Sequence, residues 1–194
     1  VFILWFGWFG FNGGSQLAIG TFDDATAVAK IFINTNLAAA GGVMTCAIIT
    51  RMIGGKTDVV QMLNGALGGL VAITAEPLAP VPFVAIIIGA IGGAIVVAGS
   101  VFLVKMRIDD VVGAIPVHMF AGIWGTLAVP LTNADTNFGA QLIGVLSINV
   151  FMFAASFLVW TVLKTTVGIR VSDEAQRKGT DVAETGVVAY SIRD

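Results

Sequence analysis

Charged side chains are scarce in this sequence, making up 11% of its 194 residues, whereas 57% are hydrophobic. A soluble domain carries about 25% charged residues, so the composition excludes an ordinary soluble domain. The apolar segments are too long and too numerous to be the buried core helices of a soluble protein. The sequence therefore predicts an all-α polytopic membrane protein.

Cysteine and histidine are almost absent, with Cys46 and His118 the only examples of each. One cysteine excludes a disulfide within the chain, and one histidine cannot form a zinc site without a second chain. The sequence also lacks a glycine-rich phosphate loop followed by lysine and a nucleophile–histidine motif. The net charge of −2 gives no indication of nucleic-acid binding. We expect no enzyme, no cofactor, no metal site and no nucleic-acid partner.

Six apolar segments have the length needed to cross a lipid bilayer. They predict transmembrane helices near residues 1–20, 25–50, 58–75, 81–104, 109–131 and 139–164. Together they predict a transmembrane domain over residues 1–164, followed by a polar tail over residues 165–194.

Lysine and arginine collect in the connections after the second, fourth and sixth segments, and the other three connections contain none. The positive-inside rule places basic connections in the cytoplasm, so we expect a multi-pass protein of the plasma membrane with a cytoplasmic C-terminal tail. The first segment begins at Val1 with no initiator methionine, which suggests a piece of a longer protein. The basic residues are Arg51, Lys56, Lys105, Arg107, Lys164, Arg170, Arg177 and Lys178.

The segment 109–131 places the single histidine, His118, near the middle of a predicted membrane helix. A polar group at this depth usually faces the interior of a bundle or a substrate pathway; the alternative is a histidine that only packs against a neighbouring helix. Asp109 and Asp110 are expected to cap the helix start. Pro116 is expected to leave one carbonyl unpaired and to bend the helix beside His118.

Trp8, Phe11 and Ser15 are spaced i, i+3 and i+7, so they share one face of the first predicted helix. Two π surfaces and a hydroxyl suit a small cation, which could bind by cation–π attraction and a hydrogen bond. The alternative is an aromatic face that only packs against other helices.

Four stretches together resemble the ammonium transporter (Amt/Mep/Rh) family, in family order and over nearly the whole chain. The first, WFGWFGFNGGS at residues 5–15, resembles the family segment W-x-G-W-x-G-F-N-x-G-S. The other three are Asn64–Thr74, the helix with Asp109-Asp110, Pro116-Val117-His118 and Gly122–Gly125, and the tail with Val167–Val171, Gly179–Asp181 and Ala189-Tyr190.

The resemblance implies a fold of eleven helices, built from two five-helix inverted repeats and a last long helix and assembled as a trimer with one pore per monomer. This chain resembles the second repeat plus the last helix. By resemblance, Trp8 lines the pore, Phe11 is the inner phenylalanine of a stacked gate and Ser15 helps to recruit ammonium at the outer mouth. His118 resembles one of two histidines that face each other, of which the other belongs to the first repeat.

The function implied is ammonium transport, with ammonium or methylammonium recruited at the outer mouth and deprotonated near the midplane histidine. The alternatives are an ammonium sensor that signals through a cytoplasmic partner and an unrelated membrane scaffold in which the histidine only packs. The family tail also implies a PII-type signalling protein as partner. The chain departs from the family pattern at Gly113, Pro116, Met119, Phe120, Thr185 and Val187.

Overall fold

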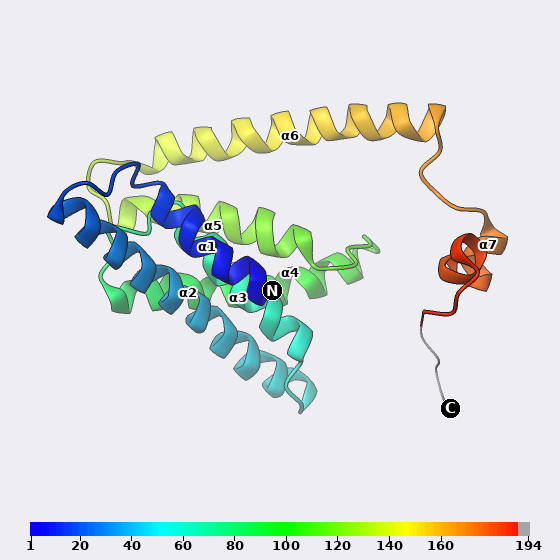
Figure 1. The fold of residues 1–194 in the computed structure, drawn as a ribbon, viewed down its shortest axis with the longest axis horizontal. Coiled ribbons are helices and arrows are strands. Elements are labelled where there is room, and N and C mark those ends of the chain that lie inside the picture. Colours follow the sequence, from blue (N-terminus) through cyan, green and yellow to red (C-terminus); the bar gives the residue numbers. More distant parts are fainter. Residues whose placement is uncertain (190–194) are drawn as a thin grey trace. The chain divides into compact units, whose positions relative to one another are not determined.

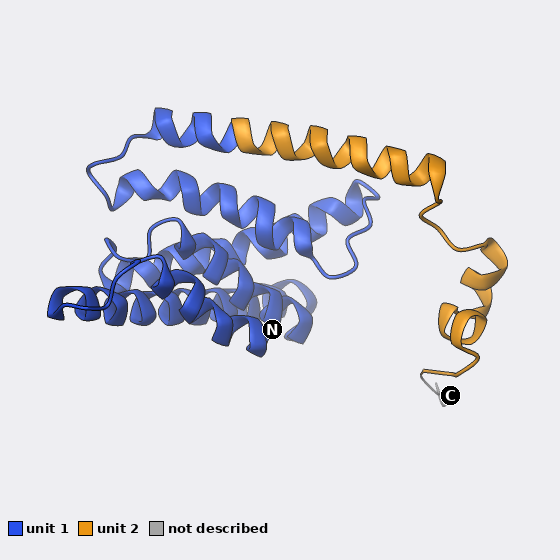
Figure 2. Cartoon of the chain, turned by 45° about the horizontal axis from the view of Figure 1, so that its top comes forward, with its two compact units in different colours: residues 1–146 blue, residues 147–194 orange. Residues whose placement is uncertain are grey.

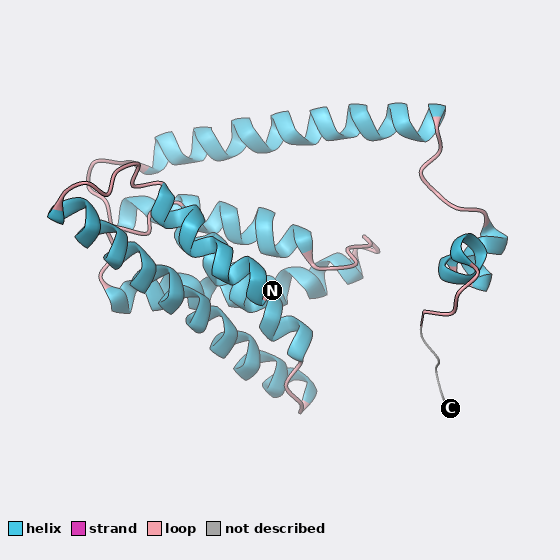
Figure 3. Ribbon diagram, in the orientation of Figure 1, coloured by secondary structure: helices cyan, strands magenta, loops and turns pink. Residues whose placement is uncertain are grey.

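The computed structural model describes residues 1–189, and every regular element in this range is a helix (Figures 1 and 3). Tyr190, the last residue of the tail motif, lies outside the described residues. The chain divides into two compact units, Val1–Leu146 and Ser147–Asp194, shown in separate colours in Figure 2. The division falls within one long helix, so the boundary expected at residue 164 stays a prediction.

Three helices, α2, α4 and α6, are long and apolar enough to cross a membrane, and two shorter apolar helices occur at Val59–Thr74 and Ile115–Leu131. For the other three predicted segments, 1–20, 58–75 and 109–131, a transmembrane helix remains a prediction. In chain order the helices are α1 (Phe2–Gly14), α2 (Phe22–Gly54), α3 (Val59–Thr74), α4 (Pro82–Lys105), the π-helical turn η1 (Ile115–Phe120), α5 (Ala121–Ala128), the 3₁₀ turn η2 (Val129–Leu131), α6 (Phe138–Thr166), α7 (Asp173–Lys178) and the π-helical turn η3 (Asp181–Thr185).

The first predicted helix, 1–20, is too long, because α1 ends at Gly14. Glycine is a poor helix former, and the chain turns at once, with Leu17 in the left-handed region at φ 62°. The second prediction, 25–50, is too short. Thr21 and Asp24 form a capping box that starts α2 at Phe22.

Helices α2, α3 and α4 form the centre of the first unit, and their backbones touch at glycines. A Cβ atom added to Gly42 of α2 would collide with the carbonyl of Gly65 in α3, and one added to Gly89 of α4 would collide with the carbonyl of Ala38 in α2. Small residues let membrane helices approach closely enough for such contacts. The three helices are thereby held as one body.

Helix α5 docks on this body through two contacts. Gly125 lies against the backbone of Ala72 in α3, leaving no room for a side chain. The indole nitrogen of Trp124 donates a hydrogen bond to the carbonyl of Ile88 in α4, at 3.0 Å. These contacts fix the helix that follows the turn containing His118.

The tail contains two short helical segments with local caps. The Ser172 hydroxyl accepts a hydrogen bond from the amide of Ala175 and starts α7. One carboxylate oxygen of Asp181 accepts the amide of Ala189 at 2.9 Å, and this hydrogen bond is the main cause of a lowered pKa for Asp181. The turn that Asp181 closes is therefore stabilised by the ionised carboxylate and loses that support as the pH falls through the lowered pKa.

Replacing Gly42 by alanine in the full-length protein is expected to lower its thermal stability. The carbonyl of Gly65 cannot make room for the new Cβ unless α2 and α3 separate, and overpacking of this kind costs about 1–3 kcal/mol. The measurement is the temperature at which the monodisperse peak is lost in size-exclusion chromatography. Gly54→Ala, at the open end of the same helix, is the control, and an equal loss in both variants would contradict the packing account.

Candidate functional site

His118 lies in η1, one turn after the helix begins, and not in the middle of a helix from residue 109. Residues 109–113 are not helical, and Gly113 adopts the left-handed φ of 75° before the helix starts at Ala114. Pro116 therefore falls in the first turn, where its missing N–H costs nothing. The predicted central position of His118 and the predicted bend at Pro116 within the helix are both wrong, because the sequence alone did not show that Gly113 ends the preceding loop.

Two side chains fix the start of this helix. The carboxylate of Asp110 accepts hydrogen bonds from the amides of Ala114 and Ile115, both at 2.8 Å, which confirms its predicted capping role. The Asn64 side-chain amide donates at 3.0 Å to the carbonyl of Val112, four residues before Pro116. Val112 lies in the loop before the helix, so its carbonyl has no helical partner and is paired by α3 instead. The loop that leads into the His118 turn is therefore held by α3.

The bulky residues that depart from the family pattern pack on a glycine of α4. A Cβ atom on Gly99 would lie 2.7 Å from the Phe120 ring and 2.8 Å from Cβ of Pro116. The Phe120 ring also contacts Phe102, with centroids 6.5 Å apart. Large side chains of η1 thus pack against Gly99 of α4. This side of η1 is the buried one, with Pro116 and Val117, whereas His118 lies on the exposed side.

The imidazole of His118 lines a groove of about 480 Å³ and makes no hydrogen bond to another described residue. The groove is apolar apart from His118 and Asn64, so a polar ligand there meets few competing groups. Its walls come from the start of α1, the first half of α3, the loop before η1 and η1 itself. They are Val1, Leu4, Val60, Leu63, Asn64, Leu67, Val111–Ala114, Val117 and His118.

Trp8 and Phe11 lie on α1 and Ser15 is its C-cap residue, and the three share one face, as their spacing predicts. The rings of Trp8 and Phe11 are in contact, with centroids 5.7 Å apart and planes tilted by 50°. The Ser15 hydroxyl donates to the carbonyl of Phe11 at 3.0 Å. Because its one hydrogen is used in this way, the hydroxyl presents its lone pairs outward and suits a ligand that donates hydrogen bonds.

The structure adds Leu4 and Thr74 to the candidate residues. Leu4, Trp8, Phe11 and Ser15 follow one stripe of α1, with Leu4 in the His118 groove and Ser15 about 16 Å further along the helix axis. Thr74 of α3 accepts the indole N–H of Trp8. Helical spacing could have indicated Leu4, whereas no local pattern links Thr74 to a residue 66 positions away.

Within residues 1–189, His118 makes no hydrogen bond to Trp8, Phe11 or Ser15. Its neighbour Val117 belongs to the apolar cluster on which Trp8 packs. The site is therefore an elongated arrangement, with the histidine at one end of the α1 stripe and the serine at the other.

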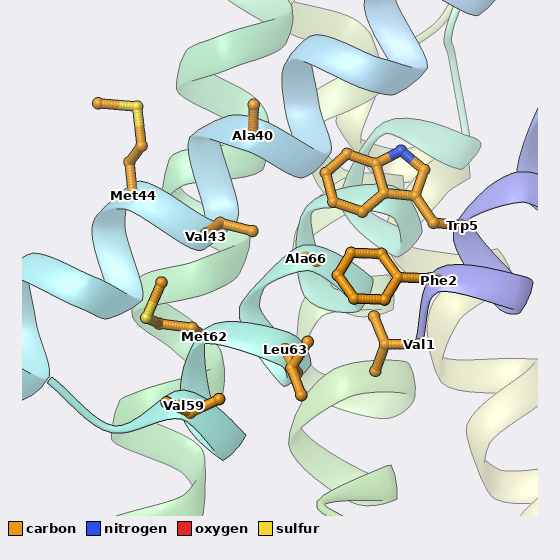
Figure 4. A pocket seen from close by; sticks show the side chains of 10 residues that line it. All are labelled: Val1, Phe2, Trp5, Ala40, Val43, Met44, Val59, Met62, Leu63 and Ala66. Atoms are coloured by element: carbon orange, nitrogen blue, oxygen red, sulfur yellow. The ribbon is translucent and has the colours of Figure 1, made fainter.

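A second hollow, of about 350 Å³, is lined only by apolar side chains from α1, α2 and α3. Figure 4 shows Val1, Phe2 and Trp5 reaching from α1 toward Leu63 and Ala66 of α3. Trp5 thus packs within the first unit and takes no part in the stripe. Within residues 1–189, no three histidine, cysteine, aspartate or glutamate side chains are grouped closely enough to hold a metal ion.

Comparison with known proteins gives one consistent family. A family model described as the Ammonium Transporter Family matches residues 1–190. Ammonium transporter Amt2 of Archaeoglobus fulgidus is 42% identical, over 97% of this chain and 44% of that protein. The ammonium transporter of Bacillus subtilis is 35% identical, over 97% of this chain and 49% of that protein.

Solved structures show the same likeness. A structure described as Sensor Amt Protein superposes with a TM-score of 0.86 at 33% identity, covering 94% of this chain and 47% of that one. Mep2 of Candida albicans superposes with a TM-score of 0.79 at 25% identity, covering 89% of this chain and 42% of that one. The chain therefore spans less than half the length of these relatives.

Replacing Asp110 by alanine is expected to loosen the start of the helix that carries His118. The amides of Ala114 and Ile115 lose their acceptor, and loss of a helix cap costs about 1 kcal/mol. Hydrogen–deuterium exchange in a peptide covering residues 110–120 should become faster. Asp109→Ala is the matched control, and faster exchange in the control alone would contradict the assignment of the cap to Asp110.

Proposed function

The chain belongs to the ammonium transporter family, and on this basis we propose that residues 1–164 form one wall of a hydrophobic path for ammonium across the membrane. In this proposal the chain is the second inverted repeat and the last helix of the family fold, with six transmembrane helices. The other wall comes from a first repeat that the chain does not contain. Such a piece conducts only when the rest of the protein completes the path.

The observation that carries the proposal is the exposed stripe of α1 together with the His118 groove. Leu4 and Phe11 are 52% and 63% exposed, although both are large apolar side chains. Ser15, at the far end of the stripe, is also exposed, as is His118, which shares its groove with Leu4. An apolar surface with one imidazole and one hydroxyl at separate points suits a pathway better than a packing face.

Ammonium can be recruited at the Ser15 end of the stripe. The cation donates hydrogen bonds and accepts none, and Ser15 offers acceptor lone pairs beside the π surfaces of Trp8 and Phe11. A hydrated cation such as K⁺ is disfavoured further along, because it would have to shed its water against the apolar side chains of the stripe and cannot lose its charge by giving up a proton.

Transfer past the apolar stripe requires removal of the charge, because a bare cation is costly in a dry apolar path. Deprotonation gives neutral ammonia, and an imidazole such as that of His118 can accept or relay the proton. The ring nitrogens of His118 are available for this proton, because the ring lines the groove and makes no hydrogen bond to another described residue. Transport as ammonia alone and as ammonia with a coupled proton both fit this arrangement.

The proposal also covers the location and the assembly of the chain. We place it in the plasma membrane as part of a homotrimer, with the C-terminal tail in the cytoplasm, in line with the basic residues of the connections. A PII-type signalling protein is the proposed partner of the tail. The chain has no proposed enzymatic activity.

A second candidate function is ammonium sensing. The observation that favours it is the TM-score of 0.86 with the structure described as Sensor Amt Protein. The same stripe would then bind ammonium and report its occupancy through the tail instead of conducting it. Saturable methylammonium flux in proteoliposomes argues for transport, and binding without flux argues for sensing.

Replacing His118 by alanine in the full-length protein is expected to change methylammonium flux in proteoliposomes, either in rate or in selectivity over K⁺. The imidazole would no longer be available to take or relay a proton at the end of the stripe. Met119→Ala, on the next residue of the same turn and also exposed, is the control. Flux and selectivity equal to those of the wild-type protein in His118→Ala would refute the role of the histidine.

Replacing Ser15 by alanine is expected to raise the methylammonium concentration at half-maximal flux about two- to tenfold, the factor that corresponds to one lost hydrogen bond. The maximal flux should change much less, because the step past His118 is untouched. Ser156→Ala on α6 serves as the control. A saturation curve that coincides with that of the wild-type protein would count against recruitment by Ser15.

A further inference from the structure

The indole of Trp8 is tied to a residue far away in the sequence. Its Nε1–H donates a hydrogen bond to Oγ1 of Thr74, the last residue of α3, at 2.7 Å and in a half-buried position. No other indole in the described chain bonds to a side chain; Trp124, for example, donates to a backbone carbonyl. The polar edge of the Trp8 ring is therefore held by one hydroxyl, while its apolar part packs on the cluster of Leu67, Leu70 and Val117.

The Thr74 hydroxyl has a single available orientation. Its own hydrogen is donated to the carbonyl of Leu70, one turn earlier in α3, at 2.7 Å. Only its lone pairs can then face Trp8, so it acts as a fixed acceptor and cannot rotate to donate toward the stripe. Because the Thr74 hydroxyl donates to Leu70, its lone pairs define both the position and the direction of the Trp8 indole N–H.

The end of α3 is itself held in place by the loop that follows. One carboxylate oxygen of Glu76 accepts the amides of Leu78 and Ala79, at 3.2 and 3.1 Å. The other accepts the side-chain amide of Asn133, beyond α5, at 2.8 Å. Glu76 therefore links the end of α3 to the loop before α4 and to the loop after η2, and Thr74 lies at this fixed helix end.

The hydrogen bond to Thr74 determines which part of the Trp8 indole faces a cation. An indole N–H directed at ammonium would be repulsive, since ammonium also carries only donors. With the N–H bound to Thr74, the ring offers its π face, tilted by 50° against Phe11, and that face attracts cations. Loss of the hydroxyl would free the N–H and allow the ring to turn.

We propose that Thr74 is a positioning residue for ammonium recruitment, acting by holding the indole of Trp8 so that its π face, and not its N–H, meets the cation. This role rests on the proposed function, because it assigns to Thr74 a part in binding the ammonium that the path takes up. Thr74 does not touch the substrate; it acts through Trp8.

The test compares Thr74→Val, which keeps the shape and removes the hydroxyl, with Thr74→Ser, which keeps the hydroxyl. Both are made in the full-length protein, together with Thr161→Val as the control. The Thr161 hydroxyl also donates to the carbonyl four residues earlier, but it lies exposed on α6 with no indole partner. Two readouts are taken: methylammonium flux in proteoliposomes, and ¹⁹F NMR of 5-fluorotryptophan-labelled protein, with the Trp8 signal identified by its loss in Trp8→Phe.

The expected result is that Thr74→Val shifts the Trp8 resonance and raises the KM for methylammonium about two- to tenfold, as for the loss of one hydrogen bond, with little change in maximal flux. Thr74→Ser should restore both readouts, and Thr161→Val should change neither. An unmoved Trp8 resonance in Thr74→Val would overturn the proposal.

A shifted resonance with an unchanged KM would also overturn it, because the hydrogen bond would then have no effect on recruitment. Failure of Thr74→Ser to restore the resonance and the KM would show that the hydroxyl is not the cause. If the wild-type protein itself shows no saturable flux, the proposed function fails and the positioning role fails with it. This outcome is distinct, since it appears before any variant is compared.

Discussion

Contact between the backbones of α2, α3 and α4 is the constraint on which the rest of the first unit depends. At Gly42, Gly89 and Gly125 even one added carbon would meet a main-chain carbonyl of the neighbouring helix. In lipid there is little hydrophobic gain from bringing helices together, so close packing of small residues must hold them. The result is a body in which α3 is enclosed by α2, α4 and α5 and cannot shift independently.

The fixed position of α3 matters because this helix holds two parts of the candidate path. Asn64 bonds to the carbonyl of Val112 and steadies the loop before His118, while Thr74 holds the indole of Trp8. These residues are ten positions apart, or about 15 Å along the helix. Helix α3 therefore sets the separation between the loop before His118 and the indole of Trp8, which lies within the stripe.

Local signals were enough to predict some of this arrangement. The predicted segments 58–75 and 81–104 match α3 and α4 to within one residue at each end, because an aspartate N-cap and a proline in the first turn mark their starts. The shared face of Trp8, Phe11 and Ser15 follows from spacing alone. The start of the His118 helix could not be predicted, since it depends on Gly113 and on Asn64 from another helix. The Trp8–Thr74 hydrogen bond likewise arises only when α1 packs against α3.

The most direct test of the central claim, that this face of α1 lines the path, is cysteine labelling at its outer end. The chain's own cysteine, Cys46, is fully buried and gives little background. In full-length protein with Ser15→Cys, a small cationic methanethiosulfonate should block methylammonium flux, and methylammonium should slow the reaction. Ile19→Cys, in the exposed loop after α1, should react without protection. Modification at residue 15 that neither reduces flux nor responds to methylammonium would contradict the account.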